Sequence, residues 1–183
     1  MRYVIFNKPY GVLCQFTDQA GRSTLKDYIP FPAIYPVGRL DFDSEGLLLL
    51  TDDGQLNHRL ADPRYKQPKT YWAQVEGNPN EEQRRKLEDG VIIGGSKTRP
   101  AKVAILTEPP AIWERSKPIR FRKTVPTTWL AITLSEGMNR QVRKMTAAVG
   151  LPCLRLVRSA IGPLQLGSLQ PGQYTEIKKP LSL

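Results

Sequence analysis

The chain has 183 residues, 40% of them hydrophobic, which suits one domain with a sizeable core and excludes a disordered chain. Its 27 Lys and Arg against 17 Asp and Glu leave a net charge of +10, which favours nucleic acid as a partner; no basic amphipathic helix or lipidation signal points to a membrane instead. Two distant cysteines, one histidine, no long apolar run and no signal peptide exclude a zinc site and a membrane span, so we expect a cytoplasmic protein.

The first part of the chain is expected to alternate strands with turns. Residues 2–6 predict a strand that a Pro/Gly turn stops, and a proline-rich extended segment follows. Residues 46–51 include four consecutive leucines and predict a strand buried on both faces. Asp52 is expected to cap the next helix, with Gln55 completing a capping box and Asp62 beyond the helix end.

The second part is expected to contain more strands, two helices and one long loop. Strands are predicted at 69–76, 102–106, 129–135, 153–157 and 173–177, and helices at 80–89 and 137–149. A segment over 109–127, rich in proline and basic residues, predicts a surface loop. Many strands with three helices favour the α+β class, with a mixed or mostly antiparallel sheet.

The most concentrated polar signal is a run of alternating acids, Asp41, Asp43 and Glu45, just before the leucine-rich strand. The run superficially matches the start of an EF-hand loop. The twelfth position would be Asp52 rather than a bidentate Glu, and prolines exclude a helix before the run, so a metal site is not expected. Taken alone, these residues also fit a solvated turn whose acids accept backbone N–H groups.

Several segments resemble the RsuA/RluE-type ribosomal pseudouridine synthases. GRLDFDSEGLLLLTDDG at 38–54 is similar to the signature segment of that family. Further resembling pieces follow the family's order: NKPYGV at 7–12, KTYWAQVEG at 69–77, EGMNRQVRKMTAAVG at 136–150 and LRLVRSAIGPLQLGSLQPG at 154–172. The likeness covers nearly the whole chain and is greatest to the RluE branch, which acts on large-subunit (23S) rRNA. It implies one catalytic domain over 1–183, with two sublobes around a central cleft and without the N-terminal S4-type domain of many relatives.

The resemblance also implies roles for individual residues. Asp41 would be the catalytic carboxylate, Tyr71 the tyrosine that stacks under the target base, and Arg143 the basic residue that pairs with Asp41. The implied reaction cleaves N1–C1′ of uridine and forms C5–C1′, without cofactor or metal; whether the carboxylate attacks C1′ or removes the C2′ proton stays open. The predicted RNA contacts are Arg39, Lys69, Arg140, Lys144, Arg120, Arg122 and Lys123.

The expected partner is 23S rRNA, free or in an assembling large subunit, and the expected state is a monomer. Two other functions remain: a basic module that binds rRNA without catalysis, and a synthase acting on another RNA such as tRNA. The joint presence of Asp41, Tyr71 and Arg143 favours the enzyme, because a protein that only binds has no chemical need for all three. Taken alone, Tyr71 would fit a core position and Arg39 an ordinary surface position.

Overall fold

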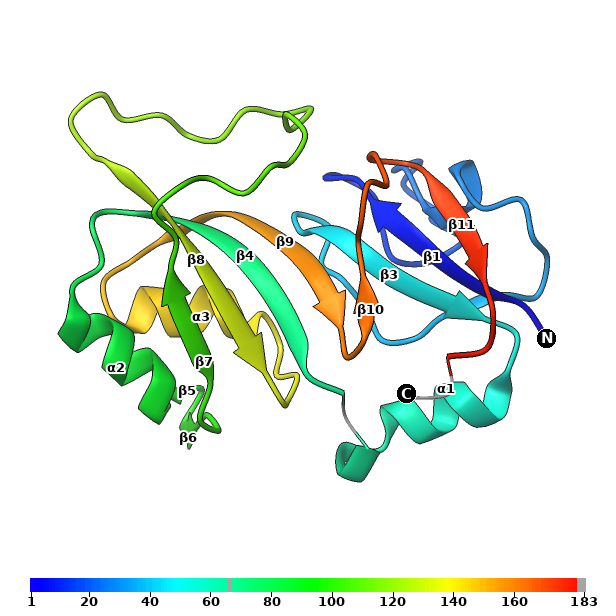
Figure 1. Cartoon of the computed structure of the whole chain (residues 1–183). Coiled ribbons are helices and arrows are strands. Elements are labelled where there is room, and N and C mark those ends of the chain that lie inside the picture. Colours follow the sequence, from blue (N-terminus) through cyan, green and yellow to red (C-terminus); the bar gives the residue numbers. More distant parts are fainter. Residues whose placement is uncertain (66, 181–183) are drawn as a thin grey trace. The chain divides into compact units, whose positions relative to one another are not determined.

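The computed structural model describes residues 1–65 and 67–180, in which the chain forms two compact units (Figure 1). Unit 1 comprises Met1–Gln67 with Arg158–Leu183, and unit 2 comprises Pro68–Val157. The described residues form three α-helices, and the strand pairings with a defined register are antiparallel. The expected α+β class is therefore confirmed.

Unit 1 is built on strands in the order β11-β1-β3-β9. Its strands are β1 (Tyr3–Lys8), β2 (Tyr35–Pro36), β3 (Glu45–Thr51), the second half of β9 (Cys153–Ile161), β10 (Leu164–Gln165) and β11 (Tyr174–Ile177). All seven residues of β3 are buried, which confirms the predicted strand with two covered faces. Short 3-10 helices lie at Leu25–Asp27 and Pro63–Tyr65.

Helix α1 (Gly54–Ala61) follows β3 and ends where predicted, but the prediction of its cap was wrong by one residue. Asp53 accepts the Leu56 N–H at 3.0 Å, whereas Asp52 accepts the Arg2 N–H at 2.6 Å. Asp53 is buried and also accepts hydrogen bonds from Tyr3 Oη at 2.7 Å and Lys179 Nζ at 3.0 Å. The Leu56 N–H first, and then the two side-chain donors, hold the pKa of Asp53 below its usual range.

Unit 2 is built on strands in the order β9-β4-β8-β7. Its elements are β4 (Lys69–Glu76), α2 (Glu81–Asp89), β5 (Ile92–Ile93), β6 (Ser96–Lys97), β7 (Lys102–Ile105), β8 (Thr127–Leu134), α3 (Gln141–Ala148) and the first half of β9. Strand β4 has the bounds predicted for it, and it pairs with β8 from Lys69↔Leu134 to Glu76↔Thr127. As predicted, no helix or strand lies between β7 and β8.

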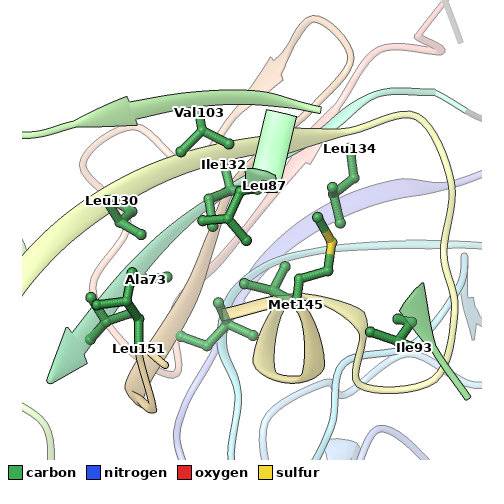
Figure 2. Close-up of a cluster of buried hydrophobic side chains, with 12 residues drawn as sticks. Ala73, Leu87, Ile93, Val103, Leu130, Ile132, Leu134, Met145 and Leu151 are labelled. Carbon is green, nitrogen blue, oxygen red and sulfur yellow. The ribbon is translucent and has the colours of Figure 1, made fainter. Parts of the chain in front are cut away.

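The core of unit 2 lies between its strands and helices α2 and α3 (Figure 2). Leu87 of α2 and Met145 of α3 are fully buried and meet Ala73, Leu130 and Ile132 of the strands. This packing confirms the predicted apolar face of α3. It holds one side of β4 and β8 in place, so residues at the strand ends have defined positions.

Helix α3 and strand β9 differ most from their predicted bounds. Helix α3 begins at Gln141 rather than near residue 137, because the Gln141 side chain accepts the Met138 N–H at 2.9 Å and closes a turn before the helix. Strand β9 continues to Ile161 instead of ending at Val157, because its second half pairs within unit 1. None of the helices in the described ranges is long and apolar enough to cross a membrane.

Candidate active site

Asp41 lies on a loop between β2 and β3, here called the Asp41 loop (residues 37–44). Backbone hydrogen bonds hold the loop along its length: Val37 N–H to Leu49 O at 2.8 Å, Gly11 N–H to Phe42 O at 2.9 Å, and Ser44 N–H to Asp41 O at 3.1 Å. Arg39 is exposed, Leu40 is buried and Asp41 is half-buried. This alternation agrees with the prediction that Arg39 and Asp41 share one side of an extended segment.

A buried arginine that was not predicted as a site residue supports the Asp41 loop. Arg158 is 2% exposed, and its Nε donates to Leu47 O at 2.8 Å while its Nη1 donates to Arg39 O at 3.4 Å. A Cβ atom on Gly46 would lie 2.4 Å from the Arg158 carbonyl oxygen, and Gly46 has a φ of +105°. The glycine after the acidic run is therefore required by this close approach.

Lys8 is the second buried cation near Asp41. Its side chain is fully buried, and Nζ donates to Pro9 O and Val12 O, both at 2.8 Å, which closes the turn after β1. Burial lowers the pKa of Lys8 to about 8, and the charges of Cys14, Glu45, Asp43 and Asp41 oppose that shift. Lys8 thus places a positive charge near the acidic run. It also orders the turn whose Gly11 N–H donates to Phe42 O.

Tyr71 and Lys69 lie on β4 of unit 2. Tyr71 pairs with Ile132 of β8, is half-buried and packs against the unit 2 core. Lys69 is half-buried at the first position of the strand, paired with Leu134. A half-buried tyrosine that packs against a rigid core and keeps part of its surface open is suited to stacking against a flat ligand.

Arg143, Arg140 and Lys144 lie at the start of α3. Arg143 is half-buried, and its Nη1 donates to Cys153 O at 3.3 Å. Arg140 is exposed and has a left-handed backbone with φ 51°. Lys144 is exposed, and its Nζ donates to Asn139 Oδ1 at 3.2 Å. Buried Gln141 donates to Glu136 at 2.5 Å, which fixes the turn that presents these charges.

The segment between β7 and β8, here called the basic loop (residues 106–126), carries the other predicted RNA contacts. Arg120, Arg122 and Lys123 are exposed as predicted. Arg122 lies 3.6 Å from a Glu76 carboxylate oxygen, so part of its charge is balanced within the protein. The unit 2 residues Trp113 and Arg155 join the loop to β9 through a hydrogen bond of 2.9 Å from Arg155 Nη2 to Trp113 O.

Comparison with known proteins decides the family. The sequence pattern of the family described as RNA pseudouridylate synthase matches residues 2–148. The chain belongs to this family.

Individual members of the pseudouridylate synthase family match most of the chain. A Xanthomonas campestris protein named ribosomal large subunit pseudouridine synthase E is 59% identical, over 93% of this chain and 92% of its own length. A protein of the same name from Vibrio parahaemolyticus is 56% identical, over 97% of this chain and 74% of its own length. A crystal structure of a pseudouridylate synthase has a TM-score of 0.80 and 31% identity, covering 97% of this chain and 70% of that one.

The predicted residues of this pseudouridylate synthase family member divide between the two units. Asp41 and Arg39 belong to unit 1, whereas Tyr71 and Arg143 belong to unit 2. The predicted pairing of Arg143 with Asp41 stays a prediction. Sequence reasoning missed the supporting role of Arg158, although that arginine lies in a segment that resembles the family. It also missed the contact that Arg155, in the same segment, makes with Trp113 O, because the two residues lie 42 positions apart in the sequence.

Proposed function

We propose that this chain isomerises a specific uridine of large-subunit (23S) rRNA to pseudouridine, with Asp41 as the catalytic carboxylate. The named relatives from Xanthomonas and Vibrio support the substrate class, because both match most of this chain at more than half identity. The observation that carries the proposal is the position of Asp41 on a loop held by backbone hydrogen bonds, with Lys8 and Arg158 buried in the same unit. A solvated turn would need no such support.

The chemistry asks for a carboxylate with a fixed position. Cleavage of N1–C1′ leaves positive character at C1′, and the base then rotates and bonds to C1′ through C5. The proton at C5 is lost while N1 gains one, so the reaction is redox-neutral and product and substrate are isomers. An ionised Asp41 either bonds to C1′ or removes the C2′ proton, and both routes need its oxygen within contact distance of the ribose.

Tyr71 and Arg143 are proposed to act in the same reaction. The target base must leave its stack in the RNA before the ribose is accessible, and an aromatic ring supplies a surface for the displaced base. Tyr71 offers such a ring, since it is half-buried and packs against the unit 2 core. Arg143 is proposed to orient the Asp41 carboxylate through an ion pair. Arg39, on the same side of the loop as Asp41, is proposed to contact a phosphate or to fill the space that the base leaves.

The proposed partner is 23S rRNA, free or within an assembling large subunit, in the cytoplasm. The net charge of +10 supports this, because binding to RNA phosphates releases condensed counterions. Lys69, Arg140, Lys144, Arg120, Arg122 and Lys123 are the proposed RNA contacts, and a monomer is the proposed state. We expect Arg122 to contribute least, since Glu76 already balances part of its charge.

The deciding experiment incubates large-subunit rRNA with wild type or Asp41→Ala and maps pseudouridine by carbodiimide treatment and primer extension. We expect a new stop with wild type that is absent with Asp41→Ala, because no other group replaces the carboxylate. The matched control is Asp52→Asn, an exposed acid beyond the far end of β3, which should leave the stop intact.

Other results would change the conclusion in defined ways. A stop that persists with Asp41→Ala would remove Asp41 from the reaction. Tight RNA binding by wild type without a stop on rRNA or on subunit precursors would favour a module that only binds. A stop on tRNA alone would move the substrate to another RNA.

A further inference from the structure

Phe121 is the most exposed aromatic residue of the described part of the chain, and it lies outside the residues proposed for catalysis. Its side chain is 81% exposed at the outer part of the basic loop, compared with 59% for Tyr35. Leaving a phenyl ring in water forgoes the stabilisation that burial would bring. An isolated exposed apolar residue is ordinary, so the surroundings of Phe121 decide what it means.

Those surroundings are strongly basic. Residues 115–123 contain five Lys or Arg and no acidic residue. Arg120 and Arg122 flank Phe121 directly, Lys123 follows, and all three are exposed. An exposed ring between cations matches the surface that binds single-stranded nucleic acid, where bases stack on aromatic rings and basic side chains hold the backbone.

The loop is held at defined points on either side of Phe121. On one side, Arg115 donates to the carbonyl oxygens of Lys117, of Pro118 at 3.1 Å and of Leu154 at 3.3 Å. On the other side, Val125 N–H donates to Arg122 O at 3.1 Å in a turn. The guanidinium of Arg115 thus orders the loop. Phe121 lies between these anchors, and its ring remains exposed to solvent. In Figure 1 this segment arcs away from β7 and β8.

We propose that Phe121 stacks on an unpaired base of the RNA substrate, while Arg120 and Lys123 contact the phosphates beside that base. The proposal rests on the RNA substrate proposed above and adds a stacking contact outside the Asp41 loop. It makes the basic loop selective for single-stranded RNA, because a base inside a duplex has no free face for the ring. The charge of the segment favours RNA over an apolar protein partner.

The test measures binding of the full chain to a single-stranded oligouridine and to an RNA duplex of the same length. Phe121→Ala should weaken binding to the single strand about 5- to 100-fold and leave binding to the duplex unchanged. Phe121→Trp should bind as wild type does, and its added indole fluorescence should be quenched by the single strand. Phe121→Leu should behave as Phe121→Ala, since it keeps apolar size without a ring.

Tyr35→Ala is the matched control, because it also removes an exposed aromatic side chain but lies in unit 1, in a segment with no cluster of basic residues. Equal binding by wild type and Phe121→Ala, or equal loss on single strand and duplex, would overturn the proposal.

Pseudouridine formation on large-subunit rRNA is measured in parallel. If the wild-type protein forms pseudouridine and Phe121→Ala binds single-stranded RNA as tightly as wild type, only the stacking contact is rejected. If Phe121→Ala loses binding to the single strand only, while the wild-type protein forms no pseudouridine, the contact is supported and the proposed reaction is rejected.

Discussion

The Asp41 loop and the basic loop both lack helix and strand, but they are held in different ways. Hydrogen bonds between backbone N–H and C=O groups of unit 1 hold the Asp41 loop, and the buried Arg158 side chain donates to its Arg39 carbonyl oxygen. The basic loop is held mainly by arginine side chains that reach carbonyl oxygens, and its outer residues are exposed. A catalytic carboxylate must stay within a fraction of an ångström, whereas side chains that contact phosphates tolerate adjustment. The difference in anchoring therefore follows the difference in proposed task.

The largest loss of stability is expected when a methyl group is added at Gly46, next to the Asp41 loop. In Gly46→Ala the new Cβ would lie 2.4 Å from Arg158 O and 2.7 Å from Arg158 N, at a φ of +105°. We expect the free energy of unfolding to fall by about 3 kcal/mol or more, measured by urea titration, with loss of activity.

Gly38→Ala is the control for this substitution. Gly38 also has a positive φ, but no atom would lie within 4 Å of its Cβ. Only the backbone conformation is then penalised, by about 1 kcal/mol. Equal losses in the two variants would show that the close approach to Arg158 does not constrain the loop.

A second test uses the titration of Lys8. Its pKa of about 8 in the folded protein lies below the ordinary value of 10.5, so between these pH values the unfolded chain binds more protons than the folded one. Stability from this group therefore rises with pH across that window, by up to about 3 kcal/mol at 1.4 kcal/mol per pKa unit. Urea midpoints of wild type and Lys8→Met from pH 7.5 to 10 should diverge in favour of wild type. A constant difference across this range would contradict the burial of Lys8 as a titrating amine.

The smallest effect on stability is expected for the anchor of the basic loop. Arg155→Lys removes the hydrogen bond to Trp113 O, so the free energy of unfolding should fall by about 1 kcal/mol. The rate of trypsin cleavage within the basic loop should rise several-fold, because local opening becomes easier. Arg85→Lys, which alters an exposed ion pair with Glu81 on α2, is the control and should leave the cleavage rate unchanged. Equal rates in both variants would show that Arg155 does not hold the loop.

Local sequence signals determined the elements whose causes lie within a few residues. The aromatic and β-branched residues of 69–76 predicted β4 with its final bounds. Helix α2 begins after Asn80, which caps the Gln83 N–H at 2.8 Å, so the signal for its start spans four residues. The resemblance around Asp41 predicted the family, which the comparison confirmed over residues 2–148.

Contacts between distant segments decided the rest. Asp53 rather than Asp52 caps α1, because Tyr3 and Lys179, near the two ends of the chain, both donate to the Asp53 side chain. Arg158 donates to Leu47 O across 111 residues of sequence. The backbone of the same residue lies so close to Gly46 that a Cβ atom there would clash, which explains why Gly46 must be glycine. The sequence by itself thus determined the family and most of the regular elements, and it supplied the residues proposed for the chemistry. Only the tertiary structure decided which buried side chains hold Asp41 in place, because burial and hydrogen bonding between remote segments leave no local pattern.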